Sequence, residues 1–357
     1  MSKWRRATLE ELAHFQRGFD ISKAEQQPGN IPVVSSSGVT SYHSVAKVKG
    51  PGVTIGRKGT LGTVFYVPQD YWPHSTSLWV TDFNGNEPKF VYYFLKTLGL
   101  EQYDVGASNP TLNRNHIHGL QIAIPDVKTQ RRIADILSAY DDLIENNHRR
   151  IAILEETARL TYRKWFGGME QGRTATLGEI CREVRRGVSP DAIAPDTPYI
   201  GLEHMPRRSI SLCEWESAQK VTSTKLAFEA GDILFGKIRP YFHKVGITFV
   251  DGVASSDAIV IKPLRPELHA YVLMTVSSDA FVAAASQGMK EGSKMPRADW
   301  KQLLNYSVVM PDDDTLTEFN KVLNPIIEQL KALCFSIRNL ATARDMLLPR
   351  LMKGEGA

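Results

Sequence analysis

Two stretches of the chain, about half its length apart, carry apolar side chains at alternating steps of four and three residues. This alternation is the heptad pattern of a coiled coil, and each stretch is long enough for about ten turns of helix. A polar residue interrupts each seam, Asn147 in the first and Arg344 in the second. We expect pairing between the two helices at Ile133, Leu137, Tyr140, Ile144, Ile151, Leu154, Leu323, Leu330, Ile337, Leu340 and Leu347.

The ends of both helices carry local signals. Asp126 follows Pro125 as a possible cap of the first helix, which should stop at Gly167-Gly168, and the acidic run 312–314 suits the start of the second. Roughly 40 residues at 1.5 Å each give a rod of about 60 Å. Pro325 is expected to kink the second helix or to delay its regular start.

The two halves of the chain repeat one another in order. Matching segments, first half against second, are Ala7–Leu12 and Ala175–Ile180, Arg17-Gly18 and Arg186-Gly187, Gly56-Arg57 and Gly236-Lys237, and Ile122–Pro125 and Val308–Pro311. Each match is short, but their common order indicates a duplicated unit whose loops differ in length.

These patterns predict an α+β fold with two mixed α/β domains separated by two long antiparallel helices that form an intramolecular coiled coil. Residues 1–125 and 169–311 contain short strand-like runs broken by Gly and Pro, and residues 126–168 and 312–357 are the helical regions. The alternative is that each helix packs only on its own globular domain.

Composition sets broad limits on function. The 357 residues have a net charge of +4 and a pI of about 8.8, a mildly basic balance that permits nucleic acid as a partner without requiring it. The three cysteines, Cys181, Cys213 and Cys334, form no C-x-x-C pair, so we expect neither a disulfide framework nor a zinc site, and a cytoplasmic location fits best. We also expect no signal peptide and no membrane span, because no run of about 18 apolar residues occurs.

No catalytic constellation is evident. The segment Gly231–Lys237 fits the start of a phosphate-binding loop, but Ile238 stands where Ser or Thr would hold magnesium and Pro240 would break the following helix. His116 and His118 have no carboxylate or cysteine cluster near them in the sequence, so no metal site is predicted.

Basic and polar residues at matching turns of the two halves are the candidate nucleic-acid contacts. Arg and Lys side chains there can reach phosphates or guanine edges, and Tyr241 can stack or donate a hydrogen bond. For each residue alone, a solvated surface charge is the competing interpretation. The candidates are Ser36, Ser37, Arg57, Lys58, Asn113, Arg114, Lys237, Arg239, Tyr241, Lys294 and Arg297.

The whole chain resembles the specificity subunit of a type I restriction-modification system. The segments 130–137 and 141–144 resemble the family's helix opening, and Gly56–Gly62 with Ser75–Ser77 resembles its recognition-domain core. In the second half, Gly231–Leu234 occupies the same place, whereas Glu318 and Phe319 depart from the helix opening.

The resemblance implies a non-catalytic subunit with two target recognition domains, 1–125 and 169–311, each reading one half of a bipartite, asymmetric site in double-stranded DNA. It also implies that the helical regions dock two methyltransferase subunits, with or without restriction subunits, and that S-adenosylmethionine binds to those methyltransferases and not to this chain. Two further hypotheses stand beside it: a coiled-coil scaffold that binds protein only, and an enzyme with an unrecognised site.

Overall fold

The computed structural model describes residues 4–104, 111–168, 173–287 and 295–355. These fall into two compact units, one formed by 1–143 with 340–357 and the other by 144–339. Each unit therefore contains one mixed block and parts of both long helices. The predicted domains differ from these units. Each predicted domain is one continuous segment, whereas each unit contains a mixed block and a part of each long helix.

Unit 1 contains a four-stranded sheet, a three-stranded sheet and a two-stranded pair. The four-stranded sheet has the order β2-β8-β5-β6, the three-stranded sheet β4-β3-β7, and β1 pairs with β9. Its elements are β1 (Arg5–Thr8), α1 (Leu9–Leu12), β2 (His14–Arg17), β3 (Ile31–Ser35), β4 (Gly38–His43), β5 (Gly52–Gly56), β6 (Val64–Val67), β7 (Trp72–Pro73), β8 (Ser77–Asp82), α2 (Pro88–Leu95), η1 (Leu100–Tyr103), α3 (Arg114–Ile117) and β9 (Gln121–Ile124).

Unit 2 contains two five-stranded sheets of order β11-β20-β17-β18-β14 and β12-β16-β19-β13-β15, and β10 pairs with β21. Its strands are β10 (Arg173–Thr176), β11 (Cys181–Val184), β12 (Gly187–Val188), β13 (Pro198–Ile200), β14 (Ser211–Leu212), β15 (Glu216–Ser217), β16 (Lys225–Phe228), β17 (Ile233–Gly236), β18 (Val245–Thr248), β19 (Gly252–Ala254), β20 (Ala258–Pro263) and β21 (Ser307–Met310). Its shorter helices are η2 (Leu177–Glu179), η3 (Pro190–Ala192), η4 (Leu202–His204), η5 (Ala218–Lys220), η6 (Pro240–Phe242), η7 (Pro266–Leu268), α5 (His269–Val276), α6 (Asp279–Gln287) and α7 (Trp300–Leu303).

The structural repeat follows the sequence repeat. The order β2-β8-β5-β6 in unit 1 corresponds to β11-β20-β17-β18 in unit 2. In both units the first strand pairs antiparallel with the last one before a long helix, as β1 with β9 and β10 with β21. The short turn after that first strand begins with a Thr capped by a Glu three residues later, Thr8 with Glu11 and Thr176 with Glu179. The duplicated segments therefore build the same core.

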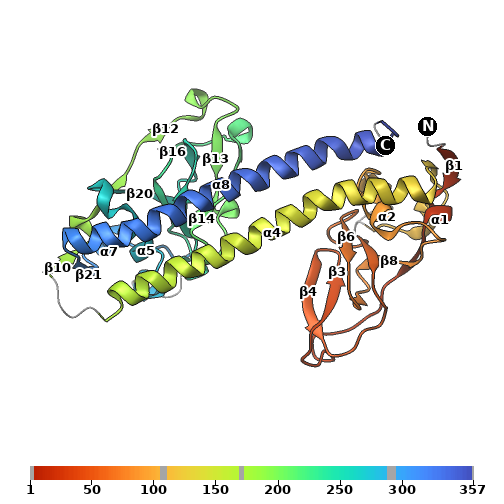
Figure 1. The fold of residues 1–357 in the computed structure, drawn as a ribbon, viewed down its shortest axis with the longest axis horizontal. Helices are drawn as coiled ribbons and strands as arrows, with labels where there is room; N and C mark the ends of the chain where they lie inside the picture. Colours follow the sequence, from red (N-terminus) through yellow and green to blue (C-terminus); the bar gives the residue numbers. More distant parts are fainter. Residues whose placement is uncertain (1–3, 105–110, 169–172, 288–294, 356–357) are drawn as a thin grey trace. The chain divides into compact units, whose positions relative to one another are not determined.

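The two long helices are α4 (Val127–Phe166) and α8 (Asp313–Leu351), labelled in Figure 1. Asp126 caps α4, since the Thr129 N–H donates to its carboxylate at 2.8 Å, and Asp312 caps α8 through Thr315 at 2.7 Å. Of the two expectations for Pro325, the delayed start is wrong, because α8 begins at Asp313 and continues through the exposed Pro325. A proline side chain facing solvent costs one backbone hydrogen bond, which the packed apolar seam around it offsets.

The helices are antiparallel within each unit. In unit 2, Phe166 near the end of α4 packs against Phe319 near the start of α8, with ring centroids 4.9 Å apart, and Asn147 donates to Ser336 at 3.0 Å. In unit 1, Asp141 forms an ion pair with Arg344. Both polar seam residues thus have partners on the facing helix. The predicted fold class, with two long antiparallel helices, is confirmed.

All eleven proposed pairing residues are at least partly buried. Ile133, Leu137, Leu323 and Leu330 are fully buried, at 0% exposure, and Ile151 is 7% exposed. The remaining six, Tyr140, Ile144, Leu154, Ile337, Leu340 and Leu347, are half-buried. The cores of both units include residues from both helices, so the helices also pack on the mixed blocks.

One cysteine prediction is wrong. Cys213, which follows β14, and Cys334, within α8, form a disulfide with their Cα atoms 4.9 Å apart, and Cys181 is free and buried. The two cysteines lie 121 residues apart in the chain, so no local spacing pattern predicts their pairing.

Among the described residues, no single helix is long and apolar enough to cross a bilayer. One bent pair, Pro266–Val276 with Asp279–Gln287, meets the length and composition limits together.

Candidate nucleic-acid interface

Unit 1 has a hollow of about 500 Å³ where the loop after β5 meets the segment around Asn113. The Leu112 N–H donates to the Arg57 carbonyl at 2.9 Å, and the Arg57 N–H donates to the Thr76 carbonyl at 2.8 Å. These backbone bonds bring two distant segments together. The hollow is lined by Gln16, Arg17, Gly18, Phe19, Asp20, Arg57, Leu78, Asn113 and Arg114.

Three of the predicted contacts, Arg57, Asn113 and Arg114, line this hollow. Arg57 is half-buried, and burial together with the nearby Arg17 lowers its pKa, while Asp20 opposes the shift. A guanidinium stays charged under such a shift. A half-buried cation beside a second cation is poised for an anion, and phosphate oxygens and guanine edges both supply acceptors.

The other unit 1 candidates lie beside the same loop. Ser36 is buried at 8% exposure, its N–H donates to Thr76 Oγ1 at 3.3 Å, and Ser37 and Lys58 are exposed. Ser36 is therefore better placed to support the loop than to reach a ligand, whereas Ser37 and Lys58 are accessible.

Unit 2 has a corresponding hollow of about 550 Å³. The Ala298 N–H donates to the Lys237 carbonyl at 2.8 Å, just as Leu112 does to Arg57 in unit 1. The lining includes Lys237 and Arg297 among the predicted contacts. The remaining lining residues are Glu183, Arg185, Ile259, Met295, Pro296, Ala298, Asp299, Trp300 and Lys301. Lys294, also predicted, lies outside the described residues.

The two hollows differ in how their charged side chains are paired. In unit 2, Arg185 forms an ion pair with Glu183 at 2.6 Å, and Arg297 with Asp257 at 3.2 Å. In unit 1, Asp20 pairs with Arg17 at 2.9 Å and leaves the other cations of the lining outside that pair. Both linings carry more cations than anions, three against one in unit 1 and four against two in unit 2, but more of the cations in unit 2 are held in ion pairs.

Arg239 and Tyr241 lie on a loop next to the second hollow. Both side chains are exposed, Tyr241 at 51%, and the Arg239 N–H donates to the Pro296 carbonyl at 2.8 Å. The prediction missed Arg17 and Arg185 as lining residues. The match between Arg17-Gly18 and Arg186-Gly187 in the sequence repeat was the signal that pointed to that segment.

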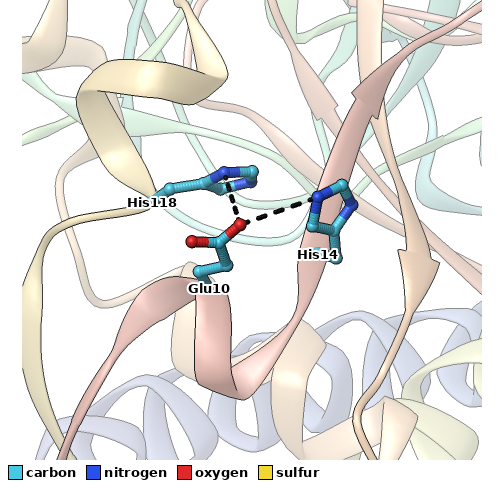
Figure 2. Close-up of side chains that lie close together, drawn as sticks. All are labelled: Glu10, His14 and His118. Carbon is cyan, nitrogen blue, oxygen red and sulfur yellow. Dashed lines mark ion pairs between the residues drawn. The ribbon is translucent and has the colours of Figure 1, made fainter.

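A cluster of Glu10, His14 and His118 in unit 1 has the residue types of a metal site, and Figure 2 shows Glu10 between the two imidazoles. The Phe15 N–H donates to Nε2 of His118 at 3.1 Å, so a neutral His118 carries its proton on Nδ1, which lies 3.5 Å from Glu10 Oε1. Burial, the main cause, lowers the pKa of His118 and favours that neutral form. A metal at Nδ1 would displace this proton to a nitrogen that already faces an N–H.

The second such cluster, Glu203, His204 and Glu216 in unit 2, has the same difficulty. The Gly201 N–H donates to Nδ1 of His204 at 3.0 Å, which leaves the proton on Nε2, 4.0 Å from Glu216. In both clusters a backbone N–H already occupies one imidazole nitrogen, which favours neutral histidines beside carboxylates over metal centres.

Comparisons with known proteins agree with the resemblance. Residues 1–156 match the family model described as the type I restriction modification DNA specificity domain. The type I restriction enzyme MjaIX specificity subunit of Methanocaldococcus jannaschii is 23% identical over 305 residues, which span 76% of this chain and 70% of the relative. The HindI specificity subunit of Haemophilus influenzae is 29% identical over 157 residues, 41% of this chain and 32% of the relative.

The fold is similar to the crystal structure of the type I restriction-modification system S subunit from M. genitalium. The TM-score is 0.64 at 15% identity, with 98% of this chain and 96% of that chain covered. At this identity the likeness shows the fold alone. The chain is therefore similar to type I restriction-modification specificity subunits, through the family match over residues 1–156 and the MjaIX relative over 305 residues.

Proposed function

We propose that this chain is the DNA-reading subunit of a type I restriction-modification complex, in which each mixed block binds one half of a bipartite, asymmetric site. The observation that carries the proposal is the recurrence of one hollow in both units. In each, a cation follows the central strand, Arg57 or Lys237, and its carbonyl anchors the incoming loop that closes the hollow. A duplicated protein with two matched basic hollows suits a ligand with two separate elements.

The side chains that line the hollows are of the types that bind DNA. Arg and Lys reach phosphates and the O6 and N7 atoms of guanine, and Asn pairs with adenine. Arg57, Arg114 and Asn113 supply these groups in unit 1, and Lys237 and Arg297 in unit 2. The exposed Ser37, Lys58, Arg239 and Tyr241 extend the proposed surface.

In this proposal the chain binds DNA and catalyses no reaction itself. Two methyltransferase subunits, which bind S-adenosylmethionine, dock on the helical regions, with or without restriction subunits. We also propose that the paired helices set the spacing of the two half-sites. We expect such a complex to act on DNA in the bacterial or archaeal cytoplasm. In that reducing compartment Cys213 and Cys334 would form a contacting thiol pair in place of the disulfide.

Exchange of residues 1–125 for the corresponding block of another family member tests the modular part of the proposal. Methylated adenines mapped in a host that expresses the chain with its neighbouring subunits should then change in one half of the recognised sequence only. A change in both halves would refute independent reading by the two blocks.

Arg57→Ala and Lys237→Ala test the hollows. Each variant should weaken binding of the full chain to a duplex with the mapped sequence by roughly 5-fold to 100-fold, because a good base or phosphate contact contributes about 1–3 kcal/mol. Arg149→Ala, which removes the same charge from an exposed position on α4, is the matched control. Equal losses in all three variants would point to general charge attraction. Binding that does not weaken as salt rises would favour the protein-only scaffold.

A further inference from the structure

The loops that follow the central strands in the two units share one backbone design. In unit 1 the Gly56 N–H donates to the Thr63 carbonyl at 2.8 Å and closes a loop of residues 57–62. In unit 2 the Gly236 N–H donates to the Lys244 carbonyl at 2.8 Å and closes a loop of residues 237–243, one residue longer. The two loops are thus structural counterparts with different contents.

Both loops place two residues in the left-handed region of backbone conformation. In unit 1 these are Gly59 and Gly62, with φ of 81° and 72°. In unit 2 they are Arg239 and His243, with φ of 47° and 54°. Glycine adopts this conformation at little cost, whereas a residue with a Cβ is strained there. The second loop therefore has the same number of left-handed residues as the first, but its left-handed residues are not glycines.

The strain is held by contacts on both sides. His243 is buried at 7% exposure, its Nε2 lies 2.8 Å from the Ser277 carbonyl, and its own carbonyl accepts from the Arg208 N–H at 2.9 Å. The Arg239 N–H is anchored on Pro296. Strained residues that the surroundings fix in place occur most often at functional sites.

The loop presents an aromatic pair with cations around it. Tyr241 is 51% exposed and meets Phe242 edge-on, with ring centroids 5.0 Å apart. The guanidinium carbon of Arg207 lies 4.0 Å from the Phe242 ring centroid, and that of Arg239 lies 6.0 Å away. Phe242 is therefore contacted by the guanidinium groups of Arg207 and Arg239, and Tyr241 is the ring exposed to solvent.

We propose that Tyr241 stacks against a base at an opened step of the half-site that unit 2 binds. The inference rests on the proposed function and adds a mode of readout to it. Exposed aromatic rings among Arg side chains are the usual platform for bases, and apolar side chains inserted between base pairs kink a duplex. A rigid loop suits this role, because the ring is already ordered before it meets DNA.

Unit 1 is proposed to read its half-site without such a ring. At the corresponding place its loop carries Thr60 and the half-buried Leu61 between the two glycines. The two half-sites should accordingly differ in how strongly the protein distorts them.

The test uses the full chain with its methyltransferase subunits and a duplex that carries the mapped wild-type sequence. Tyr241→Ala is expected to raise the Kd about 10-fold or more, since stacking contributes roughly 1–3 kcal/mol per base and 1.4 kcal/mol is tenfold. Tyr241→Phe keeps the ring and should restore most of the affinity. Leu264→Ala, at an apolar residue of unit 2 that is 49% exposed, is the matched control. Fluorescence of 2-aminopurine placed along the second half-site should rise on binding only with a ring at position 241.

Several outcomes would overturn the inference. If Tyr241→Phe loses as much affinity as Tyr241→Ala, the hydroxyl makes the contact and the ring does not stack. If Tyr241→Ala releases a methyltransferase subunit and leaves DNA affinity unchanged, the loop is a protein contact. Unchanged affinity, assembly and fluorescence would also overturn it. A wild-type complex that methylates no bipartite sequence would overturn the proposed function and this inference with it.

Discussion

The two mixed blocks share a core but are attached to the long helices in different ways. In unit 1 the attachment runs through α2, where the Tyr93 hydroxyl donates to Asp141 at 2.5 Å and Asp141 pairs with Arg344. The Glu87 N–H next to α2 also donates to Gln130 on α4 at 3.0 Å. Helix α2 thus contacts α4 directly and is linked to α8 through Asp141.

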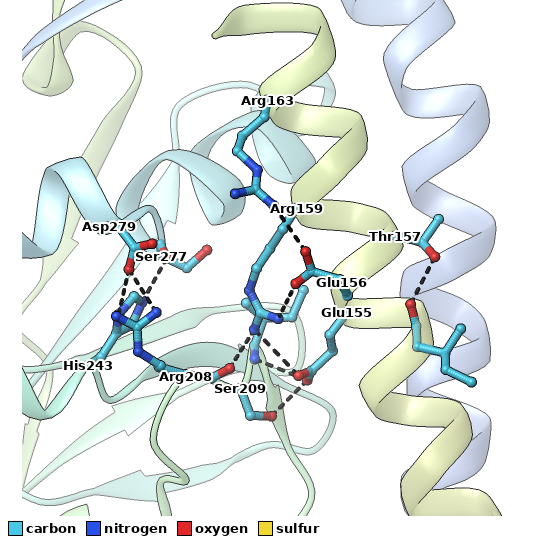
Figure 3. A network of polar contacts seen from close by, with 12 residues as sticks. Glu155, Glu156, Thr157, Arg159, Arg163, Arg208, Ser209, His243, Ser277 and Asp279 are labelled. Atoms are coloured by element: carbon cyan, nitrogen blue, oxygen red, sulfur yellow. Dashed lines mark hydrogen bonds and ion pairs between the residues drawn. The ribbon is translucent and has the colours of Figure 1, made fainter.

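Unit 2 has an additional attachment through residues 205–215, which contain β14. Glu155 of α4 is 4% exposed, and its Oε1 accepts from the Ser209 hydroxyl at 2.7 Å (Figure 3). The same oxygen accepts from the Ser211 hydroxyl at 2.7 Å and from the Ile210 and Ser211 N–H groups at 3.0 Å. On the other side, Cys213 bonds to Cys334 of α8 and Arg338 lies 3.7 Å from the Trp215 ring centroid. The repeat thus accounts for the shared sheet order, and segment 205–215 adds contacts with both long helices in unit 2.

Glu155→Ala should have the largest effect on stability. It removes a buried charge and the acceptor that four donors of one strand-and-turn segment share, a kind of loss that costs about 3–5 kcal/mol. Thermal unfolding of the full chain should shift accordingly, and hydrogen exchange should rise first at residues 209–213.

Glu156→Ala is the matched control for that prediction. Glu156 is the next residue on α4, with a side chain 52% exposed that pairs with Arg159 and Arg163. Exposed pairs contribute about 0–1 kcal/mol, so this variant should unfold close to the wild type. Similar losses from both variants would mean that helix α4, and not the attachment to 209–211, is what Glu155 supports.

Sequence patterns predicted the long helices well, because heptad spacing and caps are local signals. Asp126, Ile133 and Gly167 mark the start, seam and end of α4 within a single stretch of chain. Glu155 carried no such signal, since its partners at 209–211 lie more than 50 residues away and a glutamate on a helix normally faces water. The Cys213–Cys334 pair and the Glu10–His118 contact are hidden in sequence for the same reason.

Asp141→Ala should have an intermediate effect, confined to unit 1. It leaves the Tyr93 hydroxyl and one side of Arg344 without an acceptor, and Arg344 has a side chain only 18% exposed. We expect a loss of about 2 kcal/mol, softened by the second pair of Arg344 with Asp345. Hydrogen exchange should rise in α2 and leave unit 2 unchanged. Asp142→Ala, at the exposed neighbouring position, is the control, and faster exchange in unit 2 would contradict separate attachments.

The smallest effect is expected where the two units are most alike, at the Thr–Glu turns. The Thr8 N–H donates to Glu11 at 3.0 Å, and the Thr176 N–H donates to Glu179 at 2.9 Å. These backbone hydrogen bonds, with help from Arg5 and Arg173, lower the pKa of both carboxyls below the ordinary value of 4.5. A lowered folded pKa means that each carboxylate stabilises the fold above pH 4.5, and that this contribution is lost as pH falls through the folded pKa.

NMR titration of the two side-chain carboxyls measures this directly. Both pKa values should lie below 4.5, and Glu11→Gln and Glu179→Gln should each remove a small, similar part of the acid-side loss of stability. Salt should weaken the arginine part equally in both turns, because Arg5 and Arg173 are exposed. If the pKa of only one of the two carboxyls is lowered, the turns share a backbone conformation but differ in electrostatics. The similarity of the two units would then be limited to their backbones.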